Sequence, residues 1–217
     1  MLPSLISQFL FAGSVISFLA RPAFFLDPRI ARGATVTDIK QHPYQLSLQR
    51  GLRHACGAVI VSNKWVVTAA HCVSAPANVY RLHAGSTDKY GGVYYPVKKI
   101  VRHPAYNFLT IDYDIALLEE GGEPSPVLMK VTLPVVSRET CREIYKSIRR
   151  ITDRMICAGY MHGGQDACEG DSGGPLTADG IFYGIVSWGY KCAEPSYPGV
   201  YTNVANLLWW IKWISHI

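Results

Sequence analysis

Three short motifs that lie far apart in the chain constrain its fold most strongly, because their reactive side chains can work together only if the fold brings them into contact. Thr68-Ala-Ala-His-Cys72 supplies an imidazole, Asp112-Tyr-Asp114 a carboxylate, and Gly170-Asp-Ser-Gly-Gly-Pro175 a hydroxyl. A serine hydroxyl is a poor nucleophile until a base takes its proton. An imidazole can take that proton, and a buried carboxylate fixes the imidazole tautomer and stabilises its charged form. The motifs therefore predict a fold that brings His71, Asp114 and Ser172 together.

The residues around these three side chains strengthen the interpretation. Glycines beside Ser172 allow a sharp turn, and the backbone N–H groups of Gly170 and Ser172 are our candidates for an oxyanion hole. The alternative, a glycine-rich loop with a chance serine, does not explain the histidine motif upstream. Asp112 competes with Asp114 for the carboxylate role. Asp114 leads directly into an apolar run, so we expect it to be the buried one.

These motifs resemble those of the trypsin/chymotrypsin family of serine endopeptidases, and the likeness runs from about Arg29 to Ile217 with one gap. The resemblance implies an all-β fold of two antiparallel Greek-key β-barrels with a C-terminal helix. His71 and Asp114 would come from the first barrel and Ser172 from the second. Their implied roles are general base, orienting carboxylate and nucleophile. The implied activity is peptide-bond hydrolysis through an acyl-enzyme.

The same resemblance implies a specificity pocket. Asp166 stands where the family places an acid at the base of the pocket, which favours substrates with Arg or Lys before the cut bond. Ala167 stands where many trypsins have a serine. We expect this to favour Arg over Lys, because guanidinium can still pair bidentately with Asp166. The remaining pocket residues that match the family are Ser187, Trp188, Gly189 and Gly199.

The N-terminal region predicts secretion and zymogen activation. Residues 5–19 are apolar and end near small residues, which indicates a signal peptide over 1–20, with a signal anchor as the alternative. Arg29-Ile30 matches the family's activation site, so we expect a propeptide over 21–29 and a peptidase domain over 30–217, its barrels divided near 119–126. The new amino group of Ile30 would pair with Asp171. Arg32 departs from the family's usual glycine.

Cysteine content and charge narrow the function classes further. Six cysteines indicate an oxidising, extracellular compartment, and the absence of Cys-x-x-Cys argues against zinc. The net charge of +5 includes the pairs Lys98-Lys99 and Arg149-Arg150, which we interpret as solvated surface, with a site for an acidic partner as the alternative. Nothing indicates nucleic-acid binding. The resemblance pairs Cys56 with Cys72, Cys141 with Cys157 and Cys168 with Cys192.

The resemblance also defines the expected partners. They are protein or peptide substrates with Arg or Lys before the cut bond, and protein protease inhibitors. No cofactor, metal or stable membrane insertion is expected. The region from Gly85 to Tyr95, which matches the family's calcium loop, has few acids.

The sequence also predicts individual elements. Tyr44–Gln49 alternates with the period of a strand, 58–61 and 65–67 are short apolar strands, and Asp179-Gly180 predicts a hairpin turn. The tail from Ala205 to Ile217 predicts a helix whose apolar face packs on a barrel. We expect its three tryptophans to lie in the core; a membrane-surface helix is the alternative. The predicted apolar face consists of Leu207, Trp210, Ile211 and Ile214.

One segment of the family is missing between Asp114 and Ser172. Leu118-Glu-Glu120 runs directly into a Gly- and Pro-rich stretch ending at Pro126. The family has there the connection between barrels and the first strand of the second barrel, so we expect the second barrel to lack that strand. Three explanations remain: an incomplete gene model or splice form, a barrel that closes differently, or an inactive relative. The alternative function is therefore a non-catalytic protease homologue that acts as a binding or regulatory protein.

Overall fold

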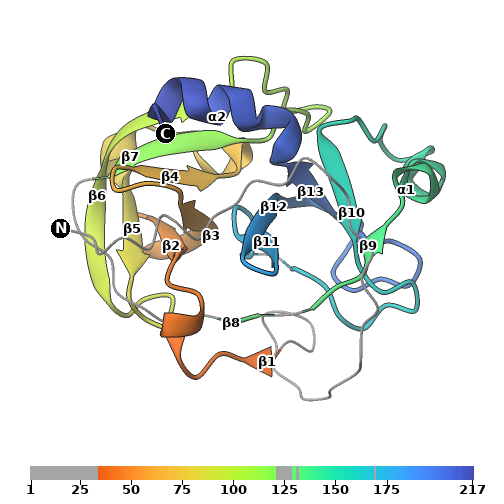
Figure 1. The fold of residues 1–217 in the computed structure, drawn as a ribbon, viewed down its shortest axis with the longest axis horizontal. Coiled ribbons are helices and arrows are strands. Elements are labelled where there is room, and N and C mark those ends of the chain that lie inside the picture. Colours follow the sequence, from red (N-terminus) through yellow and green to blue (C-terminus); the bar gives the residue numbers. More distant parts are fainter. Residues whose placement is uncertain (1–33, 121–128, 131, 169) are drawn as a thin grey trace.

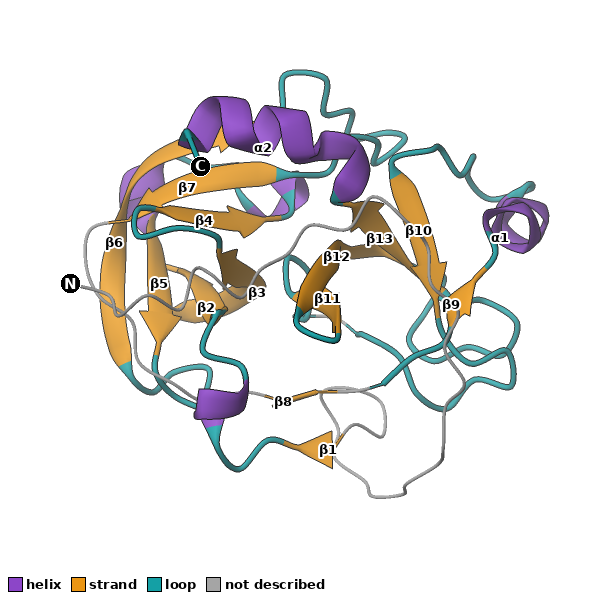
Figure 2. Cartoon of the chain, in the orientation of Figure 1, coloured by secondary structure: helices purple, strands orange, loops and turns teal. Residues whose placement is uncertain are grey.

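The computed structural model describes residues 34–120, 129–130, 132–168 and 170–217, which form two β-rich halves with a C-terminal helix across them (Figure 1). Strands dominate both halves, and the helical segments are short (Figure 2). The expected signal peptide, propeptide and Arg29-Ile30 site lie outside the described residues, as does Arg32. Among the described residues, no helix is both long and apolar enough to cross a membrane.

The first half is a closed antiparallel barrel of six strands. Leu46 and Leu48 on one strand are buried in the large core, and Gln45 and Ser47, which alternate with them, are half-buried. This is the period-two pattern that the sequence predicted. Around the barrel the strands are β2 (Gln45–Arg50), β3 (Arg53–Ile60), β4 (Trp65–Thr68), β7 (Ala116–Glu120), β6 (Val93–Arg102) and β5 (Tyr80–Ala84).

The second half is an open antiparallel sheet of five strands. Its order is β11 (Pro175–Ala178), β12 (Ile181–Trp188), β13 (Gly199–Asn203), β10 (Met155–Ala158) and β9 (Val135–Val136). The mostly-β fold with a C-terminal helix is thus confirmed. In place of a second closed barrel there is an open sheet, which agrees with the expected loss of one strand.

Short elements complete the chain. The predicted hairpin turn joins β11 to β12, and Asp179 and Gly180 both have positive φ, of 50° and 74°, as a two-residue type I′ turn requires. The remaining elements are β1 (Ala34–Thr35), which pairs with β8 (Met129–Lys130), α1 (Arg138–Tyr145), α2 (Leu208–Ser215), and 3₁₀ turns at Ile39–Gln41, Ala70–Cys72, Ala77–Val79 and Ala205–Leu207.

Three disulfides tie neighbouring segments together, with the pairing that the resemblance implied. Cys56–Cys72 joins β3 to the turn after β4, and Cys141–Cys157 joins α1 to β10. Cys168–Cys192 joins the segments on either side of β11 and β12. Each closes a loop of moderate length, which lowers the conformational entropy of the unfolded chain.

Helix α2 packs on the large core, but only one of its tryptophans is buried. Trp210 and Ile211 are fully buried with Leu207. Trp209 and Trp213 are 62% and 65% exposed, so the expectation that all three tryptophans lie in the core was wrong. The reason is the helical period: the buried face is centred among Leu207, Trp210, Ile211 and Ile214, and Trp209 and Trp213 lie on the side of the helix away from that centre.

This contrast predicts different stabilities for two neighbouring variants. Trp210→Ala is expected to lower the free energy of unfolding by about 3–5 kcal/mol, because it leaves a cavity in the core against His103. Trp209→Ala, on the exposed face, should cost about 0.5 kcal/mol or less. Urea unfolding of both variants measures the difference. Equal losses would mean that the helix packs in another orientation.

Candidate active site

His71 and Asp114 meet because the strands that carry them are paired. His71 follows β4 and Asp114 precedes β7, and Thr68 of β4 lies opposite Ala116 of β7. Nδ1 of His71 donates to Asp114 Oδ2 at 2.8 Å, and the backbone N–H of His71 donates to Oδ1 at 2.9 Å. With Nδ1 as the donor, neutral His71 leaves Nε2 unprotonated, which is the form that can accept a proton.

Two residues of the second half bond Asp114, one at its carboxyl and one at its backbone. The hydroxyl of Ser187, on β12, donates to Asp114 Oδ2 at 2.5 Å, and that of Thr202, on β13, donates to the backbone carbonyl of Asp114 at 2.8 Å. Asp114 is only 1% exposed. The sequence analysis named Ser187 only as a pocket residue and did not name Thr202. Neither contact with Asp114 could be predicted, since each joins residues that are far apart in the chain.

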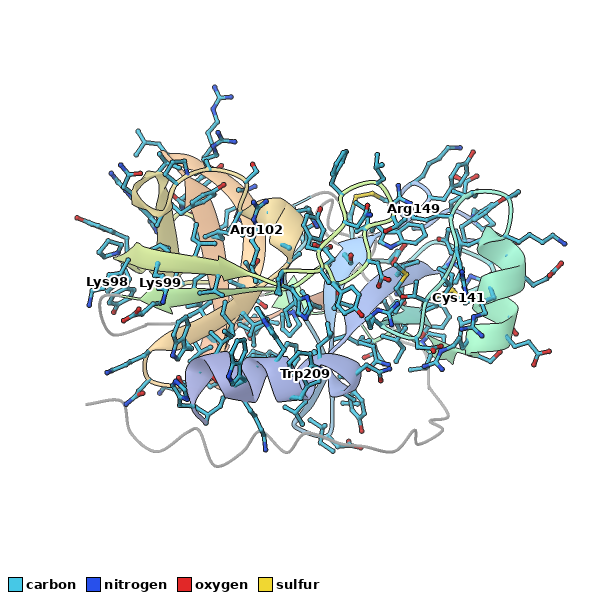
Figure 3. The ribbon with its side chains drawn as sticks, turned by 90° about the horizontal axis from the view of Figure 1, so that it is seen from above. Lys98, Lys99, Arg102, Cys141, Arg149 and Trp209 are labelled. Atoms are coloured by element: carbon cyan, nitrogen blue, oxygen red, sulfur yellow. A yellow bond between two sulfur atoms is a disulfide. The ribbon has the colours of Figure 1, made fainter. Side chains whose placement is uncertain are left out.

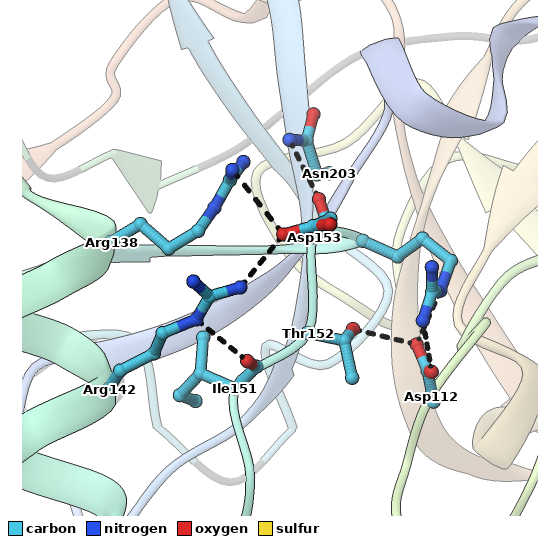
Figure 4. A network of polar contacts seen from close by, with 8 residues as sticks. Asp112, Arg138, Arg142, Ile151, Thr152, Asp153 and Asn203 are labelled. Carbon is cyan, nitrogen blue, oxygen red and sulfur yellow. Dashed lines mark hydrogen bonds and ion pairs between the residues drawn. The ribbon is translucent and has the colours of Figure 1, made fainter.

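Asp112, the competing carboxylate, bonds to other partners than His71. Its two oxygens accept from Nε and Nη2 of Arg154 at 2.9 and 2.7 Å, and Thr152 donates at 2.9 Å (Figure 4). Burial opposes its ionisation, but the hydrogen bonds from Arg154 and Thr152 outweigh burial, so the pKa of Asp112 lies below its ordinary value. Asp112 therefore links the loop before β7 to the segment before β10.

Ser172 is held against the first barrel by its own backbone. Its carbonyl accepts from the N–H of Gly57 on β3 at 2.6 Å, and the next residue, Gly173, donates to Val186 at 2.8 Å. Gly173 has φ of +81°, and a Cβ there would lie 2.2 Å from Thr68 Oγ1. Only glycine allows this approach. The Cys56–Cys72 disulfide ties the strand beside Ser172 to the turn that holds His71.

The described residues form no hydrogen bond between the imidazole of His71 and the hydroxyl of Ser172. Among the contacts of the described residues, none is a hydrogen bond from Ser172 Oγ to His71 Nε2, which lies 3.6 Å from Cys72 Sγ. Such catalytic bonds are often long before a substrate binds and tighten in its complex. The structure thus brings the three segments together and leaves the last contact unformed.

The candidate oxyanion donors lie on a turn supported by a histidine that the sequence did not single out. Gly170 has φ of +93°, and its carbonyl accepts from Nε2 of His54 at 2.7 Å, while Nδ1 of His54 bonds the hydroxyl of Ser47 at 2.8 Å. Within the described part of the chain, the N–H groups of Gly170 and Ser172 donate to no protein acceptor. Both are therefore available to an oxyanion.

A cavity of about 190 Å³ opens beside Ser172, and Asp166 lies in its wall. Asp166 is 3% exposed and accepts from the N–H groups of Ala167 at 2.8 Å and Ala193 at 3.4 Å. Burial raises its pKa to about 6, although the two N–H groups partly offset this. The other predicted pocket residues that line the cavity are Ala167, Ser187, Trp188, Gly189 and Gly199.

The cavity leaves room for a long side chain because two glycines border it. A Cβ on Gly199 would lie 2.7 Å from Asp166 Oδ1, so any side chain there would displace the acid. At Gly189 the nearest atom would be 3.7 Å away. The Cys168–Cys192 disulfide closes one side of the cavity. A buried carboxyl at such a site is suited to a cationic guest, which would neutralise a charge that is costly to bury.

Asp171, next to Ser172, is a second, half-buried acid without a close cationic partner among the described residues. Burial raises its pKa to about 6; the N–H of Cys168, which donates at 2.8 Å, opposes this rise, as does the more distant charge of Lys89. The expected partner, the amino group of Ile30, lies outside the described residues.

The described residues include one group with the spacing of metal ligands, Cys56, His71 and Cys72. Both sulfurs belong to a disulfide and carry no thiolate. Because zinc is bound by thiolates, this group is unsuited to a metal.

Comparison of the amino-acid sequence with known proteins identifies the family to which the chain belongs. The sequence profile described as trypsin matches residues 31–121 and 118–211. This chain belongs to the trypsin family of serine proteases. Relatives include trypsin 5G1 of Aedes aegypti, 38% identical with 86% of this chain and 85% of the relative covered, and a trypsin of Simulium vittatum, 38% identical with 84% and 91% covered. A vitellin-degrading protease of Bombyx mori is 39% identical, with 85% of each chain covered.

The trypsin-family match is broken where the sequence loses a segment. The profile matches in two pieces that meet at residues 118–121, at the end of β7. The alignment with the Aedes aegypti trypsin extends over 227 residues, more than the 217 of this chain, while covering 86% of it. That relative therefore contains residues that this chain lacks, in agreement with an open second sheet.

Proposed function

We propose that this protein is a serine endopeptidase that hydrolyses peptide bonds after Arg or Lys. The observation that carries the proposal is that Ser172 and the buried acid Asp166 line one cavity. A cationic side chain bound at Asp166 places the following peptide bond near the Ser172 hydroxyl. The trypsin relatives support protein or peptide substrates, and protein inhibitors that enter the same cavity are the expected regulators.

The proposed mechanism assigns one role to each group at the site. Ser172 Oγ attacks the carbonyl carbon as its proton moves to His71 Nε2, and the N–H groups of Gly170 and Ser172 stabilise the oxyanion. His71 then gives that proton to the leaving amine, and the C–N bond breaks. Water, deprotonated by His71, hydrolyses the acyl-enzyme. Asp114 stays ionised and stabilises the imidazolium, as its hydrogen bond to His71 Nδ1 allows.

Secretion and activation complete the proposal. A signal peptide over 1–20 and a propeptide over 21–29 would be removed, leaving a peptidase domain over 30–217 that divides near 119–126. Cleavage at Arg29-Ile30 would create an ammonium for Asp171, whose pKa burial raises to about 6. That ion pair would order the turn that holds Gly170. The cysteine pairs support an oxidising, extracellular compartment.

A pH dependence of ligand binding follows from the pKa of Asp166. Benzamidinium, a planar cation, is expected to bind the ionised carboxylate, so its affinity should rise about tenfold per pH unit below about pH 6 and level off above it. The affinity falls at low pH because, below the raised pKa of about 6, the Asp166 carboxyl of the empty pocket carries a proton that the cation must displace. Titration calorimetry between pH 4.5 and 8 measures affinity and proton release. Asp166→Asn should remove both the pH dependence and most of the affinity; an unchanged profile would exclude Asp166 as the binding group.

Two observations favour the second candidate, a non-catalytic homologue that binds peptides without cutting them. Ser172 Oγ makes no hydrogen bond to His71 Nε2 among the described contacts, and the second sheet is open. Among the described strands, β9 and β11 have no neighbour on their outer sides, and a sheet with open edges supports the pocket less firmly.

Labelling of Ser172 distinguishes the two candidates. Residues 30–217 with a free Ile30 terminus are treated with a fluorophosphonate, which reacts only with an activated serine, and the modified residue is located by mass spectrometry. We expect labelling of Ser172 and none in Ser172→Ala, together with cleavage of Arg peptides. A folded protein that is never labelled, with intact disulfides and a cooperative unfolding transition, would favour the binding protein.

A further inference from the structure

Arg149 lies against the wall of the substrate cavity instead of in open solvent. Its guanidinium carbon is 4.8 Å from the centre of the Trp188 ring, and Trp188 lines the cavity together with Asp166. Stacking on an aromatic face holds a guanidinium in one place while leaving its N–H groups free. Among the described residues, no carboxylate forms an ion pair with Arg149. A fixed, unneutralised cation thus stands beside the cavity.

The segment that carries Arg149 continues to a contact with the first half of the molecule. Three residues further on, Thr152 bonds Asp112, in the loop that leads to Asp114 (Figure 4). Tyr106, in the same loop, responds to this charge. Burial and Asp114 raise the pKa of Tyr106, and Arg102 and Arg149 oppose the rise. Arg149 therefore contacts the Trp188 wall and is near enough to this loop for its charge to act on Tyr106.

A second cation, Lys191, lines the same cavity. Its backbone has φ of +61°, a left-handed conformation that costs a residue other than glycine roughly 1–2 kcal/mol. Strained positions of this kind gather at functional sites. Its side chain is mostly exposed and is only loosely paired with Glu194, at 3.5 Å. Lys191 therefore adds positive charge near the cavity, weaker in effect than Arg149.

The other basic pair that the sequence singled out is remote from this place. Lys98 and Lys99 lie on β6, at the far left of the view, and Arg149 lies in the other half of the molecule (Figure 3). The positive charges of Arg149 and Lys191 near the cavity are thus separate from the Lys98-Lys99 pair. Asp112 is neutralised by Arg154, so no free acid of that loop competes for Arg149.

We propose that Arg149, assisted by Lys191, selects peptides that carry Asp or Glu two or three positions before the residue bound at Asp166. This inference rests on the proposed function, which places a cationic side chain in the cavity and the preceding residues along Ser187–Gly189. An extended peptide advances about 3.3 Å per residue, so those positions lie about 7–10 Å from the pocket residue, beyond Trp188. A carboxylate there meets a planar guanidinium with free donors.

Matched peptides test this preference. The substrates are acetyl-Xaa-Xaa-Ala-Arg amides of a fluorescent amine, with Glu, Gln or Lys at both Xaa positions. We expect kcat/KM for Glu to exceed that for Gln by roughly threefold to tenfold at 0.15 M salt, and to approach it at 1 M salt, as for a partly exposed charge pair. The Lys peptide should be the poorest.

Three variants assign the effect to particular residues. Arg149→Glu should invert the order, so that Lys exceeds Glu. Lys191→Gly removes the second charge and relieves the left-handed backbone, so a stable protein with a smaller Glu preference is expected. Arg150→Gln, at the exposed neighbouring position, is the control and should leave the order unchanged. Equal rates for Glu, Gln and Lys, or a Glu preference that survives Arg149→Glu, would overturn the inference.

Binding separates failure of this inference from failure of the proposed function. Dye-labelled forms of the same peptides are titrated against the Ser172→Ala protein, and fluorescence anisotropy gives their affinities without any need for catalysis. Absence of Ser172 labelling would reject the protease, while tighter binding of the Glu peptide would still support the role of Arg149. Cleavage of Arg peptides with equal affinities for Glu and Lys would reject Arg149 alone.

Discussion

The Asp114→Asn variant is expected to lose about 10⁴-fold in kcat, the loss known for this change in the serine protease triad. The geometry gives the reason. Asp114 Oδ1 accepts the backbone N–H of His71, so the amide oxygen of asparagine must take that place. The amide NH₂ then faces His71 Nδ1, which must become an acceptor. The ring proton moves to Nε2, and His71 can no longer take a proton from Ser172. Steady-state kinetics on an Arg peptide measures the loss.

Asp112→Asn is the matched control for that experiment. It lies two residues away and pairs with Arg154, so its loss should lower the free energy of unfolding by about 1–3 kcal/mol. Its kcat should change less than tenfold, because the His71–Asp114 bond remains. A greater loss of kcat in Asp112→Asn than in Asp114→Asn would mean that Asp112, and not Asp114, is the carboxylate that orients His71.

The second large effect is expected at the base of the cavity. Asp166→Ser should lower kcat/KM for Arg peptides by about 10²- to 10³-fold, because removing one partner of a buried ion pair costs about 2–5 kcal/mol. Peptides with Leu at the same position should lose far less, so the Arg-to-Leu ratio of kcat/KM is the decisive measurement. A ratio that does not fall would mean that Asp166 is not the group that recognises the substrate.

The wild-type pocket should also prefer Arg to Lys. Ala167 supplies only its backbone N–H, so a Lys ammonium finds no hydroxyl beside Asp166, whereas a guanidinium can use both carboxyl oxygens. Ala167→Ser provides the matched comparison within the same series: it should raise kcat/KM for Lys relative to Arg, and an unchanged ratio would reject this explanation.

Local patterns predicted much of the fold. The Leu46 and Leu48 alternation, the Asp179-Gly180 turn and the apolar face of α2 all depend on neighbouring residues, and the structure contains each of them. The exposure of Trp209 and Trp213 was not predicted, since apolar character alone does not give the direction in which a helical side chain points. The break after β7 was visible only against the family's pattern.

In the candidate site, too, local motifs could be predicted from the sequence and long-range contacts could not. The motifs around His71, Asp114 and Ser172 are contiguous in sequence, so they could be recognised there. Thr202 and His54 could not, because each contacts a residue far away in the chain, Asp114 and Gly170. Arg149 was interpreted as solvated surface, yet it stacks on Trp188. The identity of a single polar residue does not predict which distant residue it will contact in the folded chain.

The amino-acid sequence by itself determined the types of reactive group and their order along the chain, because these depend on residue identity and local spacing, and the pairing of the six cysteines followed from the family resemblance. Tertiary structure alone decided that Ser187 and Thr202 bond Asp114, that His54 supports the turn at Gly170, and that the guanidinium of Arg149 stacks on Trp188 beside the pocket of Asp166. These outcomes depend on contacts between segments distant in sequence, which form only when strand pairing fixes the relative positions of the two halves.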